Sequence, residues 1–169
     1  MERRVYEDVV VGQALHTLKK GPMSTAHIMR WSAAIENWHR IHYDRRFATA
    51  QDGLPDVLVN GSWKQHVLVQ LMKDGLGPGG WLWKIRFRYL APDIAGDTIT
   101  ARADVVRKQE VGGFGFITCS VTLANERSGV STAGVAIGVL PLKKGPPVPY
   151  PFPKHAEFDA IALPEDIRP

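Results

Sequence analysis

The 169-residue sequence contains a single cysteine, Cys119. One cysteine cannot form an intramolecular disulfide or supply a zinc knuckle. No apolar run approaches the roughly 18 residues that a membrane-spanning helix needs. Acidic residues also stand near the N-terminus, where a signal peptide has its apolar core. These absences predict a cytoplasmic protein of a reducing compartment that has no membrane partner.

Long runs of one charge are missing as well. The chain has 21 basic and 17 acidic residues, and 13 of the basic but only 8 of the acidic ones lie in residues 1–90. A nucleic-acid-binding arm usually carries a block of about five or six like charges, or basic and aromatic motifs. We therefore expect no nucleic-acid partner, and the mild basic excess suits a small anionic ligand better.

Proline is sparse until the end of the chain, where eight of the 12 prolines lie from Pro141 onward. Proline lacks the amide donor and fixes φ, so segment 146–153 can be neither a helix nor a central strand. At about 100–200 residues per domain, we expect one domain over residues 1–140. A Pro-rich extended tail should follow over 141–169. Its Tyr150 and Phe152 predict packing on the body or on a partner subunit.

The front half carries helix signals. Ser24 or Thr25 can accept a hydrogen bond from a free amide at a helix start, as can Asp44. Segment 61–75 has apolar side chains on nearly every face of its middle, which is typical of a buried helix, and Gly75 is a natural stop. The expected helices are therefore about 24–34, 45–50 and 61–75.

The back half alternates with the period of two that is typical of strands. In segment 81–89 the alternation puts Trp81, Trp83, Ile85, Phe87 and Tyr89 on one face and Lys84, Arg86 and Arg88 on the other. The expected strands are 81–89, 98–108, 114–123 and 131–140. A central buried helix (about 62–75) followed by a four-strand antiparallel meander is an α+β plan. A sheet wrapped around one helix is the hot-dog fold.

Chemically active side chains are densest in segment 36–44, between two expected helices. His39 and His42 could supply a general base, because histidine exchanges protons near neutral pH. Glu36 and Asn37, just upstream, could orient that base. Glu36 and the two histidines could instead hold zinc, but no HExxH pattern supports this and we expect no metal. The structural alternative is a surface loop whose histidines cap helix ends.

Gly61 opens the expected buried helix, whose free amide groups can bind a carbonyl oxygen or an anion. Glycine there allows close approach of a substrate, although it could equally be a turn residue. Lys84, Arg86 and Arg88 could hold phosphates or simply form the solvent-exposed face of the sheet. Ser62 lacks a Gly-x-Ser-x-Gly context, and Cys119 is expected to be an inert buried thiol.

Three groups of residues, in this order, resemble the MaoC-like hydratases. They are His39-Arg40-Ile41-His42-Tyr43-Asp44, then Asn60-Gly61-Ser62, then Phe87-Arg88-Tyr89-Leu90-Ala91-Pro92 with Ala95-Gly96-Asp97-Thr98. The resemblance runs from about residue 6 to residue 140. It implies a hot-dog fold and reversible addition of water to 2-enoyl thioesters of coenzyme A or acyl carrier protein, without a cofactor.

The chain departs from the common family pattern at three positions. Asn37 stands where the pattern has aspartate, Arg40 replaces a proline, and Asn60 replaces a histidine. The variant Asn-x-His-Arg-Ile-His-Tyr-Asp is similar to the branch that contains mesaconyl-C4-CoA hydratase and the mitochondrial 3-hydroxyacyl-thioester dehydratase. The missing aspartate is therefore compatible with an active enzyme.

The resemblance also implies roles for individual residues. His42 would be the general base, and Asn37 would hold the water or the imidazole. Glu36 could replace the lost carboxylate only if the loop bulges, and His39 is either catalytic or structural. The helix start near Gly61 would polarise the thioester carbonyl. The residues expected to bind substrate are Asn60, Gly61, Ser62, Arg40, Arg86 and Arg88.

Two other functions remain open. One is a non-catalytic, acyl-binding partner subunit of a heteromeric hydratase, which the change at Asn37 favours and the intact His42 opposes. The other is a hot-dog thioesterase, which is disfavoured because the central helix has only one acid, Asp74, at its far end. The open edge of an antiparallel sheet predicts a homodimer or a higher oligomer in either case.

Overall fold

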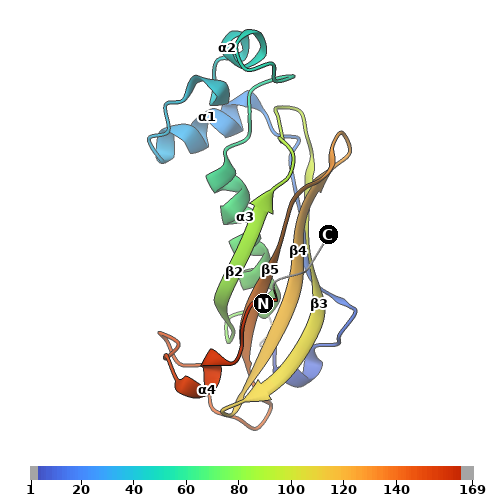
Figure 1. Ribbon diagram of the computed structural model, residues 1–169, viewed down its shortest axis with the longest axis vertical. Coiled ribbons are helices and arrows are strands. Elements are labelled where there is room, and N and C mark those ends of the chain that lie inside the picture. The colour runs from blue at the N-terminus through green and yellow to red at the C-terminus, as the bar shows by residue number, and fades with distance from the viewer. Residues whose placement is uncertain (1–3, 165–169) are drawn as a thin grey trace.

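The computed structural model describes residues 4–164 and shows a curved sheet with one long helix against it (Figure 1). Its elements in order are η1 (Tyr6–Asp8), β1 (Ala14–Lys20), α1 (Thr25–Ala34), η2 (Arg40–His42), α2 (Arg45–Ala50), α3 (Gly61–Leu76), β2 (Trp81–Tyr89), β3 (Ile99–Val111), β4 (Phe114–Asn125), β5 (Gly129–Pro141) and α4 (Ala156–Asp159). The expected α+β hot-dog architecture is confirmed.

The sheet has five antiparallel strands in the order β1-β3-β4-β5-β2. The expected four-strand meander is therefore wrong in part, because β2 pairs with β5 and leaves the other side of β3 to β1. Alternation of apolar and polar residues predicts that a segment is a strand but carries no information about its neighbour. Segment 90–98 connects β2, at one edge of the sheet, to β3, which lies next to β1 at the opposite edge.

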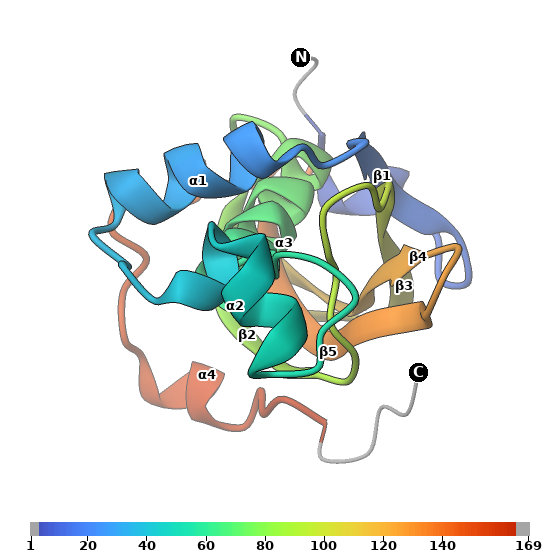
Figure 2. The same ribbon diagram turned by 90° about the horizontal axis from the view of Figure 1, so that it is seen from above.

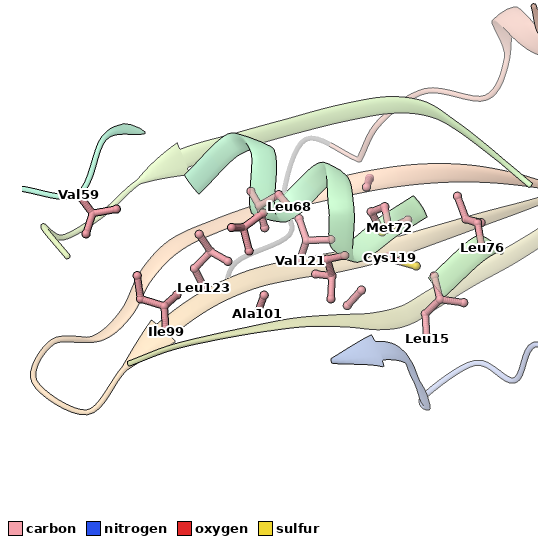
Figure 3. Close-up of a cluster of buried hydrophobic side chains, with 14 of the residues drawn as sticks. Leu15, Val59, Leu68, Met72, Leu76, Ile99, Ala101, Cys119, Val121 and Leu123 are labelled. Carbon is pink, nitrogen blue, oxygen red and sulfur yellow. The ribbon is translucent and has the colours of Figure 1, made fainter. Parts of the chain in front are cut away.

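Helix α3 packs on one face of the sheet, called here the inner face. Leu68, Leu71, Met72 and Leu76 are fully buried there against apolar side chains of β3, β4 and β5. Figure 3 shows Leu68, Met72 and Leu76 of α3 together with side chains of the sheet such as Cys119 and Val121. The helix is nevertheless not buried on all sides, since Ser62, Gln65, His66 and Lys73 are exposed. The apolar residues in the middle of α3 are therefore buried on the face that contacts the sheet, and the opposite face of the helix is exposed.

The C-terminal end of α3 lies beyond the expected glycine. Gly75 is buried inside the helix, and a Cβ there would meet the Leu15 side chain at 2.9 Å. The helix ends at Leu76, and Gly77 follows with φ 73°. Glycine at position 75 is thus a close-packing residue, whereas Gly77 supplies the positive φ that lets the chain turn away.

A bulge between Leu82 and Lys84 divides β2. Leu82, Ile85 and Phe87 pack with the inner core, while Trp81 and Trp83 pack on the opposite, outer face. The expectation that all five alternating apolar residues share one face is wrong, because an extra residue in a strand reverses the alternation.

The segment after β5 lies across the outer face of the sheet. Phe152, Phe158 and Ile161 are buried there against Phe116 and Ile137. The Trp83 ring lies 5.9 Å from that of Phe152 and 6.3 Å from that of Phe158. The sheet therefore has an apolar layer on both faces. The division of the chain at residue 140 into a domain and a tail stays a prediction.

Helices α1 and α2 stand together beyond one end of the sheet, as the view from above shows (Figure 2). Ser24 caps α1 by accepting a hydrogen bond from the His27 amide at 3.2 Å, and Asp44 caps α2 through the Phe47 amide at 3.0 Å. Both expected caps are confirmed. Between residues 4 and 164, every helix is too short or too polar to cross a bilayer.

Substitution Phe158→Ala tests whether the outer layer contributes to stability. Phe158 is 4 % exposed, and removing a buried phenyl ring costs about 3–5 kcal/mol of the free energy of unfolding. Urea unfolding should show this loss. Tyr150→Ala should cost clearly less, because the Tyr150 side chain, expected to pack, is 85 % exposed, and its ring contact with Trp81 at 5.2 Å is worth about 0.5–1.5 kcal/mol. Equal free energies of unfolding for the two variants would contradict a stabilising contribution from the outer apolar layer.

Candidate active site

The short extended segment 57–60 brings the candidate site together. The Leu58 amide donates to the Ile41 carbonyl at 2.8 Å, and the Val59 amide donates to the Asp93 carbonyl at 2.8 Å. Asn60 follows at the start of α3 and hydrogen-bonds through its side chain to Ser32 of α1. Segments far apart in the sequence therefore meet at the N-terminus of α3.

His42 is buried, with 6 % of its surface exposed, and lies beside this segment. Its Nδ1 is 2.8 Å from the Leu58 carbonyl oxygen. A carbonyl oxygen only accepts, so Nδ1 carries the proton and Nε2 keeps its lone pair in the neutral ring. Burial lowers the pKa of His42, the hydrogen bond to Leu58 partly opposes this, and nearby His39 lowers it further. The ring is therefore a neutral base at pH 7.

The side chains of Asn37 and His39 each accept a hydrogen bond from a backbone amide two residues further along the loop. The Asn37 Oδ1 accepts from the His39 amide at 3.2 Å, and the His39 Nδ1 accepts from the Ile41 amide at 3.4 Å. The His39 ring lies 6.4 Å from that of His42. In the part of the chain that the structure describes, no hydrogen bond joins Asn37 to His42, so Asn37 fixes the loop and its amide NH₂ stays available.

Glu36 and Arg40 lie at the surface of this loop. Glu36 is exposed just after α1 and has φ 54°, a left-handed conformation that is unfavourable for a residue with a Cβ. Arg40 pairs with Asp44 at 2.7 Å and lies over the Phe47 ring. The Phe47 amide and then Arg40 lower the pKa of the Asp44 carboxyl. The Arg40 charge is thus paired within the loop, the Glu36 carboxylate is exposed, and in the described residues neither side chain hydrogen-bonds to His42.

The first turn of α3 offers free amide groups. The Asn60 side chain is directed to Ser32 and makes no cap on the helix, so the amides at the helix start, which have no intrahelical acceptor, are not covered by it. The Ser62 Oγ accepts from the Trp31 Nε1 at 2.9 Å. The Tyr89 hydroxyl donates to the Gly61 carbonyl at 2.6 Å, and a Cβ on Gly61 would meet its ring at 3.0 Å.

A buried ion pair, which the sequence reasoning missed, anchors this turn. Lys64 Nζ lies 2.7 Å from Asp93 Oδ2, and both side chains are almost fully buried. The same ammonium donates to the carbonyls of Ala91 and Ser131, each at 3.1 Å. Asn125 Nδ2 and Ser131 Oγ donate to Asp93 at 2.5 and 2.6 Å. The available signal was helical spacing, because Lys64 stands one turn before buried Val67 and Leu68.

The remaining expected residues lie elsewhere. Arg86 and Arg88 alternate with inward-facing Phe87 and so face outward, and Arg86 donates to the Pro164 carbonyl. The structure does not bring them together with His42. Burial raises the pKa of the Cys119 thiol to about 12, as an inert thiol requires. Among residues 4–164, no three His, Cys, Asp or Glu side chains are placed to hold a metal ion.

The chain as a whole is similar to proteins of known family and fold. The family model described as hydroxyacyl-thioester dehydratase type 2 matches residues 9–95. No curated protein matches the chain. A chain of the ChsH1–ChsH2 complex from Mycobacterium tuberculosis is similar, with 27 % identity, a TM-score of 0.68, and coverage of 78 % of this chain and 98 % of that one.

Two further solved structures share the fold. The (R)-hydratase from A. caviae involved in PHA biosynthesis is 21 % identical, with a TM-score of 0.70 over 80 % of this chain and 99 % of that one. The MaoC-like dehydratase from Rhodospirillum rubrum is 16 % identical, with a TM-score of 0.70 over 83 % and 98 % of the two chains.

The Lys64–Asp93 pair is tested by a double-mutant cycle. Lys64→Met leaves a buried carboxylate unpaired, and Asp93→Asn leaves a buried ammonium unpaired, so each should cost about 3–5 kcal/mol of the free energy of unfolding. The double variant removes both charges and should cost clearly less than the sum of the single changes. Additive losses in urea unfolding would show that the two side chains are not coupled.

Glu36→Gly separates a structural role from a catalytic one. Glycine adopts φ 54° without the Cβ penalty, so the variant should gain about 0.5–1 kcal/mol in thermal or urea unfolding. Glu36 is exposed, and the His42 ring hydrogen-bonds to the Leu58 carbonyl and not to Glu36, so turnover of any substrate should stay within about twofold, well under 1 kcal/mol of barrier. A large loss of turnover would restore Glu36 as a catalytic carboxylate.

Proposed function

The chain belongs to the hydroxyacyl-thioester dehydratase type 2 family, and on that premise we propose that it catalyses the reversible hydration of 2-enoyl thioesters to 3-hydroxyacyl thioesters. The acyl group is carried by coenzyme A or an acyl carrier protein. His42 is the general base and the start of α3 binds the thioester carbonyl. The observation that carries this proposal is the neutral His42, held by Leu58 three residues before Gly61.

The proposed step has a simple proton balance. His42 Nε2 removes a proton from water, and the water oxygen bonds to C3 of the enoyl group. The C2–C3 π electrons move toward the thioester carbonyl, whose oxygen gains negative charge. The same imidazole then gives its proton to C2, so that one water has been added. Dehydration follows the reverse path.

The helix start is suited to the charge that develops in this step. Its amides carry partial positive charge, and donors already aimed at a developing oxyanion contribute several kcal/mol to catalysis. The hydrogen bonds of Ser62 to Trp31 and of Gly61 to Tyr89 fix this turn before substrate arrives. Supporting contacts of this kind reduce the cost of positioning the substrate.

Other residues have narrower proposed roles. Asn37 directs its amide toward the attacking water, because its oxygen is already bound to the His39 backbone. His39 and Arg40 brace the loop, while Asn60 sets the position of α3 through Ser32. Arg86 and Arg88 remain candidate contacts only for distant parts of a substrate or a carrier protein. A homodimer through an open sheet edge would complete the assembly.

A second candidate is a partner subunit of a heteromeric hydratase. It is supported by Asn37 in place of the usual aspartate and by the similarity to a chain of a two-protein complex. The two candidates differ in one respect that can be measured, because a partner subunit alone would bind acyl thioesters without turning them over.

The first test follows the loss of the enoyl-thioester absorbance of crotonyl-CoA, a longer enoyl-CoA and mesaconyl-CoA with the purified chain. His42→Ala should lower turnover by about 10²–10⁴-fold, the usual contribution of a general base. His155→Ala is the matched control, since it removes an exposed histidine beside α4, which lies at the other end of the molecule (Figure 1). Turnover that survives in His42→Ala would reject His42 as the base.

The pH dependence follows from the lowered pKa of His42. Protonated His42 cannot accept a proton, so kcat/KM for hydration should be constant near pH 7 and fall on the acid side, with an apparent pKa below 6.5. The same group gives stability that is fully present above pH 6.5 and is lost as the pH falls through its folded-state pKa. An acid limb that is unchanged in a slow but active His42 variant would assign the titration to another group.

A further inference from the structure

A pocket of about 370 Å³ opens between α1, α3 and the end of β1. Its volume lies in the range of about 300–1,000 Å³ that is typical of small-molecule sites. Figure 2 shows α1 beside the start of α3, with the turn after β1 leading into it. We call it the α1–α3 pocket, and its lining residues are Lys20, Gly21, Met23, His27, Arg30, Trp31, Ala34 and Trp63.

The lining combines an apolar surface with positive charge. Met23, Trp31 and Trp63 supply the apolar part. The Trp31 indole N–H is already bound to Ser62 and its ring lies 5.2 Å from the His66 ring, so these contacts hold the Trp31 wall in place. Within the described part of the chain, none of the residues that line the pocket is acidic. Lys20 and Arg30 take part in no ion pair with any other residue from 4 to 164.

His27 adds a third donor at the same place. Its Nδ1 accepts a hydrogen bond from the Ser24 amide at 3.2 Å. In the neutral ring the proton is therefore on Nε2, which can donate to a ligand. Lys20, His27 and Arg30 are therefore three hydrogen-bond donors in a pocket whose described lining residues include no acidic one. Such a group of donors can bind a carboxylate or phosphate oxygen.

The pocket is connected to the proposed catalytic turn. Trp31 forms part of its wall and donates to Ser62, the second residue of α3, at 2.9 Å. The next residue, Ser32, bonds to Asn60 at the helix start. The pocket therefore adjoins the start of α3, where the proposed function places the thioester.

We propose that the α1–α3 pocket binds an extended ligand chain that ends in a carboxylate or a phosphate. Met23, Trp31 and Trp63 contact the chain, and Lys20, His27 and Arg30 bind the anionic end. This inference rests on the proposed function for the identity of the whole ligand. The anion belongs either to the far end of the acyl group or to the phosphopantetheine arm of the carrier.

Binding can be measured without turnover, through the fluorescence of the tryptophans that line the pocket. The probes are two pairs that differ in charge: octanoate with octanol, and 4′-phosphopantetheine with pantetheine. In at least one pair the anionic member should bind about tenfold more tightly, the effect of one charge-assisted hydrogen bond. A preference for octanoate assigns the acyl end, and a preference for 4′-phosphopantetheine assigns the carrier arm.

Two variants locate the site. Arg30→Gln should abolish most of the tenfold preference for the anion, whereas Arg46→Gln, an exposed arginine on α2 outside the lining, should leave it unchanged. Ala34→Phe fills the pocket from an exposed position on α1 and should weaken both members of a pair. Circular dichroism and the unfolding midpoint show that each variant is folded.

The results separate this inference from the proposed function. Equal binding of charged and neutral probes, no effect of Arg30→Gln, or no probe binding because a second copy covers the pocket would each overturn it, even if the enoyl thioesters are turned over. If the chain prefers anionic over neutral probes through Arg30 but turns over no enoyl thioester, the result supports the proposed anion site and contradicts the proposed hydratase activity.

Discussion

The buried pair of Lys64 and Asp93 is the constraint on which the arrangement of the site depends. Each charge loses several kcal/mol of hydration in the interior, and the pair is tolerated because every polar atom has a partner. The ammonium has Asp93 and two carbonyls as acceptors, and Asp93 also accepts from Asn125 and Ser131. These partners come from the β2–β3 connection, β4 and β5, so the first turn of α3 can occupy only one position on the sheet.

The position of that turn determines the rest of the candidate site. The Asp93 carbonyl also accepts from the Val59 amide, and neighbouring Leu58 holds His42. A shift of α3 along the sheet would therefore move the free amides and the imidazole together. A core of leucines alone would not prevent such a shift, because hydrophobic burial is non-directional. The hydrogen bonds of the buried pair are directional and specify the register.

The two faces of the sheet have different tasks. The inner face holds α3 and the site at its start, while the outer face is covered by the aromatic side chains of Phe152 and Phe158. The bulge in β2 makes this possible, since it turns Trp83 outward while Ile85 stays inside. Lys84 and Arg86 then donate to carbonyls at the end of the described chain. Lys84 and Arg86, which the sequence suggested as phosphate ligands, thus donate hydrogen bonds to backbone carbonyls of the same chain.

Local sequence determined the elements of this protein and the type of its chemistry. The caps at Ser24 and Asp44, the period of two in the back half, and the dense polar loop around His42 all depend on residues close together in the chain, so they could be read directly. The pairing of β1 with β3 and of β2 with β5, the side of β2 that each tryptophan occupies, and the Lys64–Asp93 pair depend on residues about 30 or more apart. Only the tertiary structure decides these, because the free energy of a buried charge or of a strand partner is set by what packs against it and not by its neighbours in sequence.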